Sequence, residues 1–222
     1  MLARSVALFR KDLKQTLGGG SELFQAFLPG LLLIFVFSLS REPGQVLLTQ
    51  LVATVFWLVS AFALVLIANI FYRLEERGTI RFALLLAPVP VQSIWLGKCA
   101  GIFCLLFICQ LVWWPFFLLF LSVSSQGSWI DGLLLVFSVD FGLAVLGSLL
   151  GTFAIGREGR DALLTVLCFP LLLPLLLGAI NLGETFLNGG GQQSAWWGLI
   201  FAFDALFTGA ALLLFPFAYT GE

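Results

Sequence analysis

Residues 46–70 read VLLTQLVATVFWLVSAFALVLIANI, and residues 71–98 continue as FYRLEERGTIRFALLLAPVPVQSIWLGK. The first stretch is apolar and exceeds the roughly 20 residues that a helix needs to cross a bilayer. The second stretch contains four basic residues, and basic residues beside a span are retained on the cytoplasmic side of the membrane. We therefore expect a transmembrane helix that leads into a cytoplasmic segment.

The same apolar pattern recurs along the whole chain. Hydrophobic residues make up 60% of the 222 residues, charged residues make up 10%, and the mean hydropathy is +1.07. A soluble domain carries about 25% charged residues, so this composition excludes an ordinary soluble protein and predicts an all-α polytopic membrane protein. Six transmembrane helices are expected, at about 23–39, 46–70, 99–121, 132–155, 162–180 and 196–217. Because they occupy more than half of the chain, we expect a single domain over residues 1–222.

Basic residues fall almost entirely in alternate gaps between these spans. Ten of the eleven Lys and Arg residues lie on one expected side of the membrane, and only Arg41 lies on the other. This asymmetry predicts that both termini and the segment between the second and third spans are cytoplasmic. The net charge of −1 gives no reason to expect a nucleic-acid partner.

Residues 1–20, before the first span, predict an amphipathic helix that lies in the cytoplasmic interface. The apolar residues of this stretch recur at helical spacing, and the basic residues lie largely off that stripe. The expected apolar stripe consists of Leu2, Val6, Phe9, Leu13 and Leu17. The glycines at 18–20 then allow the chain to turn into the membrane.

The segment between the second and third spans carries its own helix signals. Gly78 and Thr79 can end one helix and cap the next. Residues 80–87 would form about two helical turns, and Pro88 would end them. Pro90 can begin the following helix, because the first turn tolerates a missing N–H group. A short helix held between two spans could press against a partner and pass movement to both spans.

These motifs resemble those of the type-2 ATP-binding-cassette (ABC) exporter permeases. That superfamily has an acidic residue followed by x-x-Gly-Thr and an apolar residue, then a leucine-rich turn, a proline and Gly-Lys, after its second span. Within it, the chain is most similar to the CcmB family, the B subunit of the haem exporter of cytochrome c maturation. The similarity is carried by Pro88-Val89-Pro90 followed by Lys98, and by the paired Pro170 and Pro174 of the fifth span. Arg81 stands where the family usually has an acidic residue.

The resemblance implies a permease subunit of an ATP-driven exporter that acts in haem handling in the bacterial inner membrane. The sequence lacks the G-x-x-x-x-G-K-[ST] loop that holds nucleotide phosphates, so we expect a non-enzymatic subunit with a separate ABC ATPase. A second copy of the chain, other cytochrome c maturation membrane subunits and the lipid bilayer are the further expected partners. The residues expected to couple to the ATPase are Glu75, Glu76, Arg77, Gly78, Thr79, Arg81, Pro88 and Pro90.

Asp140 and Asp204 lie inside expected spans, where ionisable residues are costly and are functional candidates. They could carry protons in a secondary transporter, bond to a neighbouring helix or line a wet cavity. Two further alternatives remain open, namely a type-2 permease for another cargo and an ATP-driven scaffold that releases a haem chaperone.

No cofactor or metal is expected from the residues that usually bind one. The chain has no His, and its cysteines lack metal-ligand spacing, which favours an apolar packing role for them. These cysteines are Cys99, Cys104, Cys109 and Cys168. The adjacent Trp113 and Trp114 suit packing or stacking on a flat cofactor. Gly147-x-x-x-Gly151 indicates close helix packing, either within the chain or between subunits.

Overall fold

The computed structural model describes residues 2–18, 21–40, 48–76, 86, 89–121, 126–154, 160–191 and 194–220. The regular elements in these ranges are helices, which confirms the all-α prediction. The helices are α1 (Leu2–Gly18), α2 (Ser21–Leu39), α3 (Thr49–Glu76), α5 (Val91–Leu121), α6 (Trp129–Phe153), α7 (Arg160–Leu187) and α8 (Ser194–Thr220).

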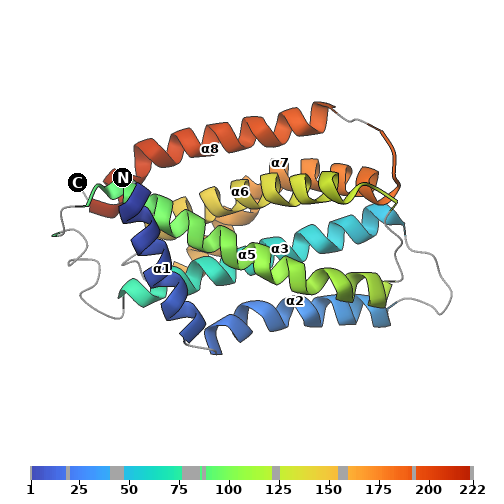
Figure 1. The fold of residues 1–222 in the computed structure, drawn as a ribbon, viewed down its shortest axis with the longest axis horizontal. Helices are drawn as coiled ribbons and strands as arrows, with labels where there is room; N and C mark the ends of the chain where they lie inside the picture. Colours follow the sequence, from blue (N-terminus) through green and yellow to red (C-terminus); the bar gives the residue numbers. More distant parts are fainter. Residues whose placement is uncertain are drawn as a thin grey trace.

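The helices form an elongated bundle with the two termini at one end (Figure 1). Helices α2, α3, α5, α6, α7 and α8 run roughly along the long axis, whereas α1 runs obliquely across α5. The end of α3 and the beginning of α5 lie at the same end of the bundle as the termini. We call this the loop end, and the opposite end the far end.

Helix α6 is at the centre of the packing. It contacts α3, α5, α7 and α8, and its residues 143–146 are completely buried. Small residues are frequent along it, which allows neighbouring backbones to approach closely. The buried side chains of α6 are therefore placed to affect most of the bundle.

Five helices in the described ranges are long and apolar enough to cross a membrane. They are Thr49–Arg73, Val91–Leu121, Trp129–Phe153, Val166–Leu187 and Ser194–Tyr219. The apolar part of α2, Phe24–Leu39, is shorter. A polytopic membrane protein is thus supported, while the predicted first span does not reach the length of the other five.

The helices on either side of the segment between the second and third spans extend past the expected spans. Helix α3 continues to Glu76 and α5 begins at Val91, beyond the expected span ends near residues 70 and 99. The reason is packing, because Tyr72 and Trp95 are buried and extend the apolar core to the loop end. The predicted 80–87 helix lies outside the described residues except for Leu86, which is helical and exposed.

Helix α7 also extends beyond its predicted end at residue 180, to Leu187. The polar residues that suggested a loop make hydrogen bonds inside the helix. The Asn181 amide donates to the Leu177 carbonyl at 2.7 Å, and the Thr185 hydroxyl donates to the Asn181 carbonyl at 2.8 Å. The helix ends before Gly189, whose positive φ of 69° favours glycine.

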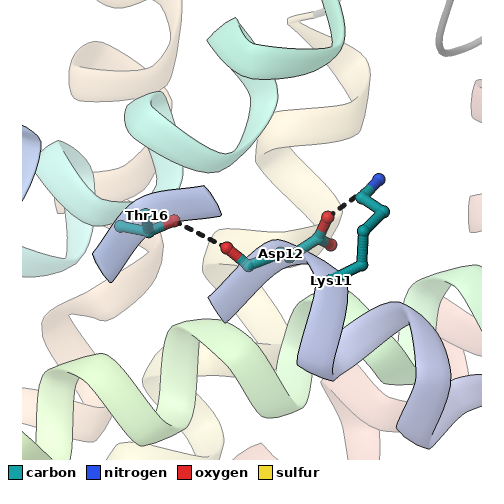
Figure 2. A network of polar contacts seen from close by, with 3 residues as sticks. All are labelled: Lys11, Asp12 and Thr16. Carbon is teal, nitrogen blue, oxygen red and sulfur yellow. Dashed lines mark hydrogen bonds and ion pairs between the residues drawn. The ribbon is translucent and has the colours of Figure 1, made fainter. Parts of the chain in front are cut away.

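Helix α1 is present as predicted, and several of its polar residues pack on the bundle. Ser5, Asp12 and Thr16 are buried, whereas Val6 is 46% exposed. Figure 2 shows how the polar groups are satisfied on α1 itself: Lys11 Nζ lies 3.0 Å from Asp12 Oδ1, and the Thr16 hydroxyl donates to the Asp12 carbonyl at 3.0 Å. Because these polar groups have partners, a polar face of α1 can pack on the bundle.

Candidate coupling site and intramembrane polar residues

A hydrogen-bonded cluster joins three helices at the loop end. The Tyr72 hydroxyl, near the end of α3, donates to the main-chain carbonyl of Ser148 on α6. The Thr152 hydroxyl lies 2.9 Å from both the Tyr72 hydroxyl and the Ser148 carbonyl. All three residues are buried. We call this group, together with Trp95, the loop-end clamp.

Trp95 brings α5 into the loop-end clamp. Its indole Nε1 donates to the Ser148 hydroxyl at 2.9 Å, and that hydroxyl donates to the Val145 carbonyl at 2.9 Å. Ser148 therefore accepts from α3 through its carbonyl and from α5 through its side chain. Residues 77–90 connect these two helices, so both flanks of the connecting segment are bonded to one residue of α6.

Lys98 lies beside the clamp rather than in a loop. Only 1% of this residue is exposed, and its Nζ lies 4.5 Å from the centre of the Tyr72 ring. An ammonium group over an aromatic ring is attracted by the negative face of the ring. Lys98 belongs to α5, which begins at Val91, so the end of the expected cytoplasmic segment is helical.

Gly97 permits α1 to approach the same part of α5. A Cβ atom at Gly97 would lie 3.1 Å from the Leu8 Cβ and 3.3 Å from the Ser5 carbonyl oxygen. Consecutive residues of a helix point to different sides, so Gly97 faces α1 while Lys98 faces α3. Gly97 and Lys98 thus connect α1 to α3 through the first turns of α5, the helix that follows the connecting segment.

The glycine pair of α6 is an internal packing contact. A Cβ atom at Gly151 would overlap the Tyr72 ring, and one at Gly147 would lie 2.7 Å from the Leu64 Cδ1 atom. Both neighbours belong to α3. The structure therefore favours the internal alternative for Gly147-x-x-x-Gly151, and Gly151 makes room for the clamp tyrosine.

A second polar group lies in the middle of the bundle. The Gln110 amide Nε2, on α5, donates to Asp140 Oδ1 at 2.8 Å and to the Ser60 hydroxyl at 3.0 Å. The Ser60 hydroxyl donates to the Phe56 carbonyl at 2.9 Å. All of Asp140 is buried, and its Oδ2 atom has no hydrogen-bond partner within the described ranges.

Asp204 approaches α6 from α8. Its Oδ1 atom lies so close to Gly142 that a Cβ atom there would overlap it. Residues two apart on a helix point in roughly opposite directions, so Asp140 and the Asp204 contact lie on different faces of α6. Each carboxyl group is buried, but the structure does not bring the two into one hydrogen-bonded group in the part of the chain it describes.

The two adjacent tryptophans have separate surroundings. Trp113 is fully buried, stacks on Phe27 with ring centres 6.1 Å apart, and donates to the Phe27 carbonyl at 3.3 Å. Trp114 contacts Phe56 edge-to-face at 5.8 Å. The pair therefore does not form a common stacking surface, and Trp113 has the packing role.

The predicted coupling residues are only partly described. Glu75 and Glu76 are the last residues of α3, and Pro90 directly precedes α5, where its carbonyl accepts from the Ser93 N–H at 2.8 Å. The remaining predicted residues, Arg77, Gly78, Thr79, Arg81 and Pro88, lie outside the described residues. The sequence reasoning missed Trp95, Ser148, Thr152 and Gln110. Ser148 and Thr152 carried a usable signal, since they are hydroxyl residues one turn apart in an apolar span.

Comparison with protein families gives one match to nearly the whole chain. The family model described as CcmB protein matches residues 3–221. The chain belongs to the CcmB family. This confirms the resemblance seen in the sequence. The comparison with curated proteins found no match.

CcmB proteins are membrane permease subunits of an ABC system that acts in haem export for cytochrome c biogenesis. The family and the long apolar helices together identify this CcmB chain as a multi-pass transport protein. The loop-end clamp holds both flanks of the segment that was predicted to couple to an ATPase.

Proposed function

We propose that residues 1–222 form one type-2 ABC transmembrane domain, which a separate ATPase drives through residues 72–90. The observation that carries this proposal is the bonding of Tyr72 and Trp95 to the same residue, Ser148. Force applied to the connecting segment would reach α3 and α5 together and pass to α6. Such a joined unit suits rigid-body rocking of packed helices.

The proposed assembly is a homodimer with two ATPase copies in the bacterial inner membrane. Helix α2 is the first span and completes the set of six, and the loop end, with both termini, faces the cytoplasm. The excess of Lys and Arg in the gaps assigned to that side supports this orientation. Other cytochrome c maturation membrane subunits complete the complex, and haem is the handled substrate.

Docking can be tested by purifying the chain with the ATPase encoded beside it. We expect the Glu75→Ala, Glu76→Ala and Arg77→Ala changes, combined, to reduce co-purification and ATPase rate. Arg41→Ala is the matched control, because Arg41 belongs to the opposite expected side. Unaltered assembly and ATPase rate in the triple variant would contradict the docking role.

Orientation can be tested by labelling a single introduced cysteine. Leu86 is 87% exposed, whereas Cys99, Cys109 and Cys168 are buried and Cys104 is half-buried. A membrane-impermeant maleimide should therefore modify Leu86→Cys in inside-out vesicles and leave the native chain almost unlabelled. Modification only in right-side-out vesicles would overturn the proposed orientation.

Proton-coupled transport is a second candidate, because the Asp140 carboxyl is fully buried with only one oxygen hydrogen-bonded within the described ranges. Under the ATP-driven proposal, Asp140→Asn and Asp204→Asn variants keep their transport rate in ATP-loaded vesicles. Loss of transport with an unchanged ATPase rate would favour the proton-coupled candidate.

A scaffold role can be separated from transport with vesicles that carry the reconstituted complex and a haem chaperone. Movement of labelled haem across the bilayer supports export. Release of the chaperone on ATP addition, without haem movement, supports the scaffold alternative.

A further inference from the structure

Helix α1 carries positive charges that its contacts with the bundle do not use. The sequence of α1 contains one acidic residue, Asp12, which is buried and lies 3.0 Å from Lys11 (Figure 2). Arg10 and Lys14 are exposed, and neither makes an ion pair with another residue that the structure describes. The acidic group is thus buried while two positive charges face outward, so the outer side of α1 is complementary to an anion.

The outer side of α1 is also partly apolar. Val6 is 46% exposed, and Phe9 and Leu13 are half-buried. An α-helix turns by about 100° per residue, so Arg10 follows Val6 by about 40° around the axis and Lys14 follows Arg10 by the same angle. Around the axis of α1, the buried polar side is therefore followed by an apolar side and then by a basic side.

The crossing of α1 and α5 places α1 near a surface of the bilayer (Figure 1). The two helices meet at Gly97, where an added Cβ atom would lie 3.1 Å from the Leu8 Cβ. Helix α5 has 31 residues, so it is about 46 Å long and exceeds a hydrocarbon core of about 30 Å by roughly 8 Å at each end. Gly97 lies about 9 Å from the first residue of α5. A centred α5 thus holds α1 at the boundary between lipid chains and headgroups.

At this level the apolar and basic sides of α1 match the two parts of a phospholipid. A helix in the interface buries its apolar side at the boundary of the lipid chains, and long basic side chains extend from it to the charged headgroups. Arg and Lys donate charge-assisted hydrogen bonds to phosphate oxygens. The attraction is strongest for lipids with a net negative charge, because a zwitterionic headgroup carries its own cation. A soluble acidic protein would match the charges of α1 but would leave its apolar side in water.

We propose that α1 binds the headgroups of anionic phospholipids through Arg10 and Lys14. The apolar side, which consists of Val6, Phe9 and Leu13, contacts the chains of the same lipids. The buried polar side packs on the bundle and fixes the rotation of α1 about its axis, so the basic side stays turned outward. Such binding requires that the chain spans a membrane, but it requires neither an ATPase nor a particular orientation of the loop end.

The test places a fluorophore on α1 and quenchers on the lipids of the bilayer. Ala7 is exposed and lies about 60° from Arg10 around the helix axis, so a bimane label on Ala7→Cys reports on the basic side. The native cysteines are buried or half-buried. The full chain is placed in phosphatidylcholine nanodiscs that contain a small, equal amount of nitroxide-labelled phosphatidylglycerol or phosphatidylcholine. We expect stronger quenching by phosphatidylglycerol, and high salt should reduce the difference.

Variants of the basic side identify the residues responsible. We expect Arg10→Gln and Lys14→Gln to lower the preference for phosphatidylglycerol by about fivefold for each charge removed. Arg10→Lys combined with Lys14→Arg keeps both charges and should keep the preference. Arg41→Gln is the control for total charge, because Arg41 belongs to the opposite expected side, and it should leave the preference unchanged.

Each of three results would overturn the proposal. Equal quenching by the two labelled lipids in the chain with native charges would show that α1 lies at the bilayer without preferring anionic lipid. The absence of quenching by either lipid would show that the basic side faces water or a soluble partner. An equal loss of preference in the Arg10→Gln and Arg41→Gln variants would show a response to total charge. Because no ATPase is present, none of these results bears on the proposed ATP-driven function.

Discussion

The hydroxyl of Tyr72 on α3 donates to the main-chain carbonyl of Ser148 on α6. This carbonyl lies in the last two turns of α6, so the bond ties the loop ends of two helices that are far apart in the sequence. Trp95 bonds to the side chain of the same serine. One residue of the central helix therefore holds both flanks of the segment that we propose meets the ATPase.

Tyr72→Phe should weaken this connection without changing the shape of the side chain. We expect the free energy of unfolding to fall by about 0.5–1.5 kcal/mol, the usual net value of one hydrogen bond, and ATP-driven activity to fall further. Unfolding in mixed micelles and the ATPase rate of the complex are the measurements. Thr54→Ala is the matched control, since the Thr54 hydroxyl donates to the Gln50 carbonyl within α3 itself, at 2.7 Å. Equal effects of both changes would argue against a connecting role.

Gly151→Ala should be more damaging than Gly147→Ala. The new methyl group at Gly151 would overlap the rigid, buried Tyr72 ring, while the one at Gly147 would meet a Leu64 methyl that can rotate away. We expect Gly151→Ala to cost about 1–3 kcal/mol of unfolding free energy and Gly147→Ala less. Gly209→Ala is the control, because the added carbon would meet open space beyond its own helix backbone in the described structure, and it should be neutral or stabilising by up to about 1 kcal/mol. The three midpoints of chemical unfolding give the comparison.

Gln110→Leu removes the amide that donates a hydrogen bond to Asp140, and so tests how much this bond stabilises the protein. The change leaves a buried carboxyl group without its donor, so we expect a loss of about 1–3 kcal/mol of unfolding free energy. Asp140→Leu in the same chain should recover most of that loss, because removing both polar partners avoids the buried unpaired group. A double-mutant cycle measures the coupling. If the two losses simply add, the hydrogen bond does not contribute.

Lys98→Met and Lys98→Ala separate the charge of this side chain from its volume. Lys98→Met keeps most of the volume, so we expect a stability within about 1 kcal/mol of the native chain, since the lost cation–π attraction is offset by no longer burying an ammonium group. Lys98→Ala leaves a cavity and should cost about 2–5 kcal/mol. Thermal unfolding of the two variants in one detergent gives the difference. A Met variant as unstable as the Ala variant would show that the charge, not the packing, stabilises the site.

Helix existence could be predicted from the sequence because a membrane imposes a length and an apolar composition on each crossing. The residues at which the helices end could not be predicted, since they depend on which polar side chains form hydrogen bonds or pack against a partner. Asn181 and Lys98 looked like loop residues. The first is satisfied inside α7, and the second is buried over Tyr72.

The candidate site was harder to predict for the same reason. The Gly-Lys pair was noticed as a motif, but its two separate contacts, with α1 and with Tyr72, depend on three helices meeting. Ser148 accepts from Tyr72 through its main-chain carbonyl, which carries no residue-specific signal, and only its hydroxyl, which accepts from Trp95, could be noticed in the sequence. Gln110 was one polar residue in a long apolar span, and only its distances to Asp140 and Ser60 reveal a network.

The shortness of α2 has a mechanical consequence for the surrounding lipid. Its apolar run, residues 23–39, would measure about 25 Å at 1.5 Å per residue, against a hydrocarbon core of about 30 Å. A crossing of that length forces the leaflets toward each other or draws polar flanking groups inward, at a cost that grows with each ångström of mismatch. With α2 crossing the membrane as we propose, the bilayer beside it should be thinned, so that membrane thickness itself becomes a variable to which this permease responds.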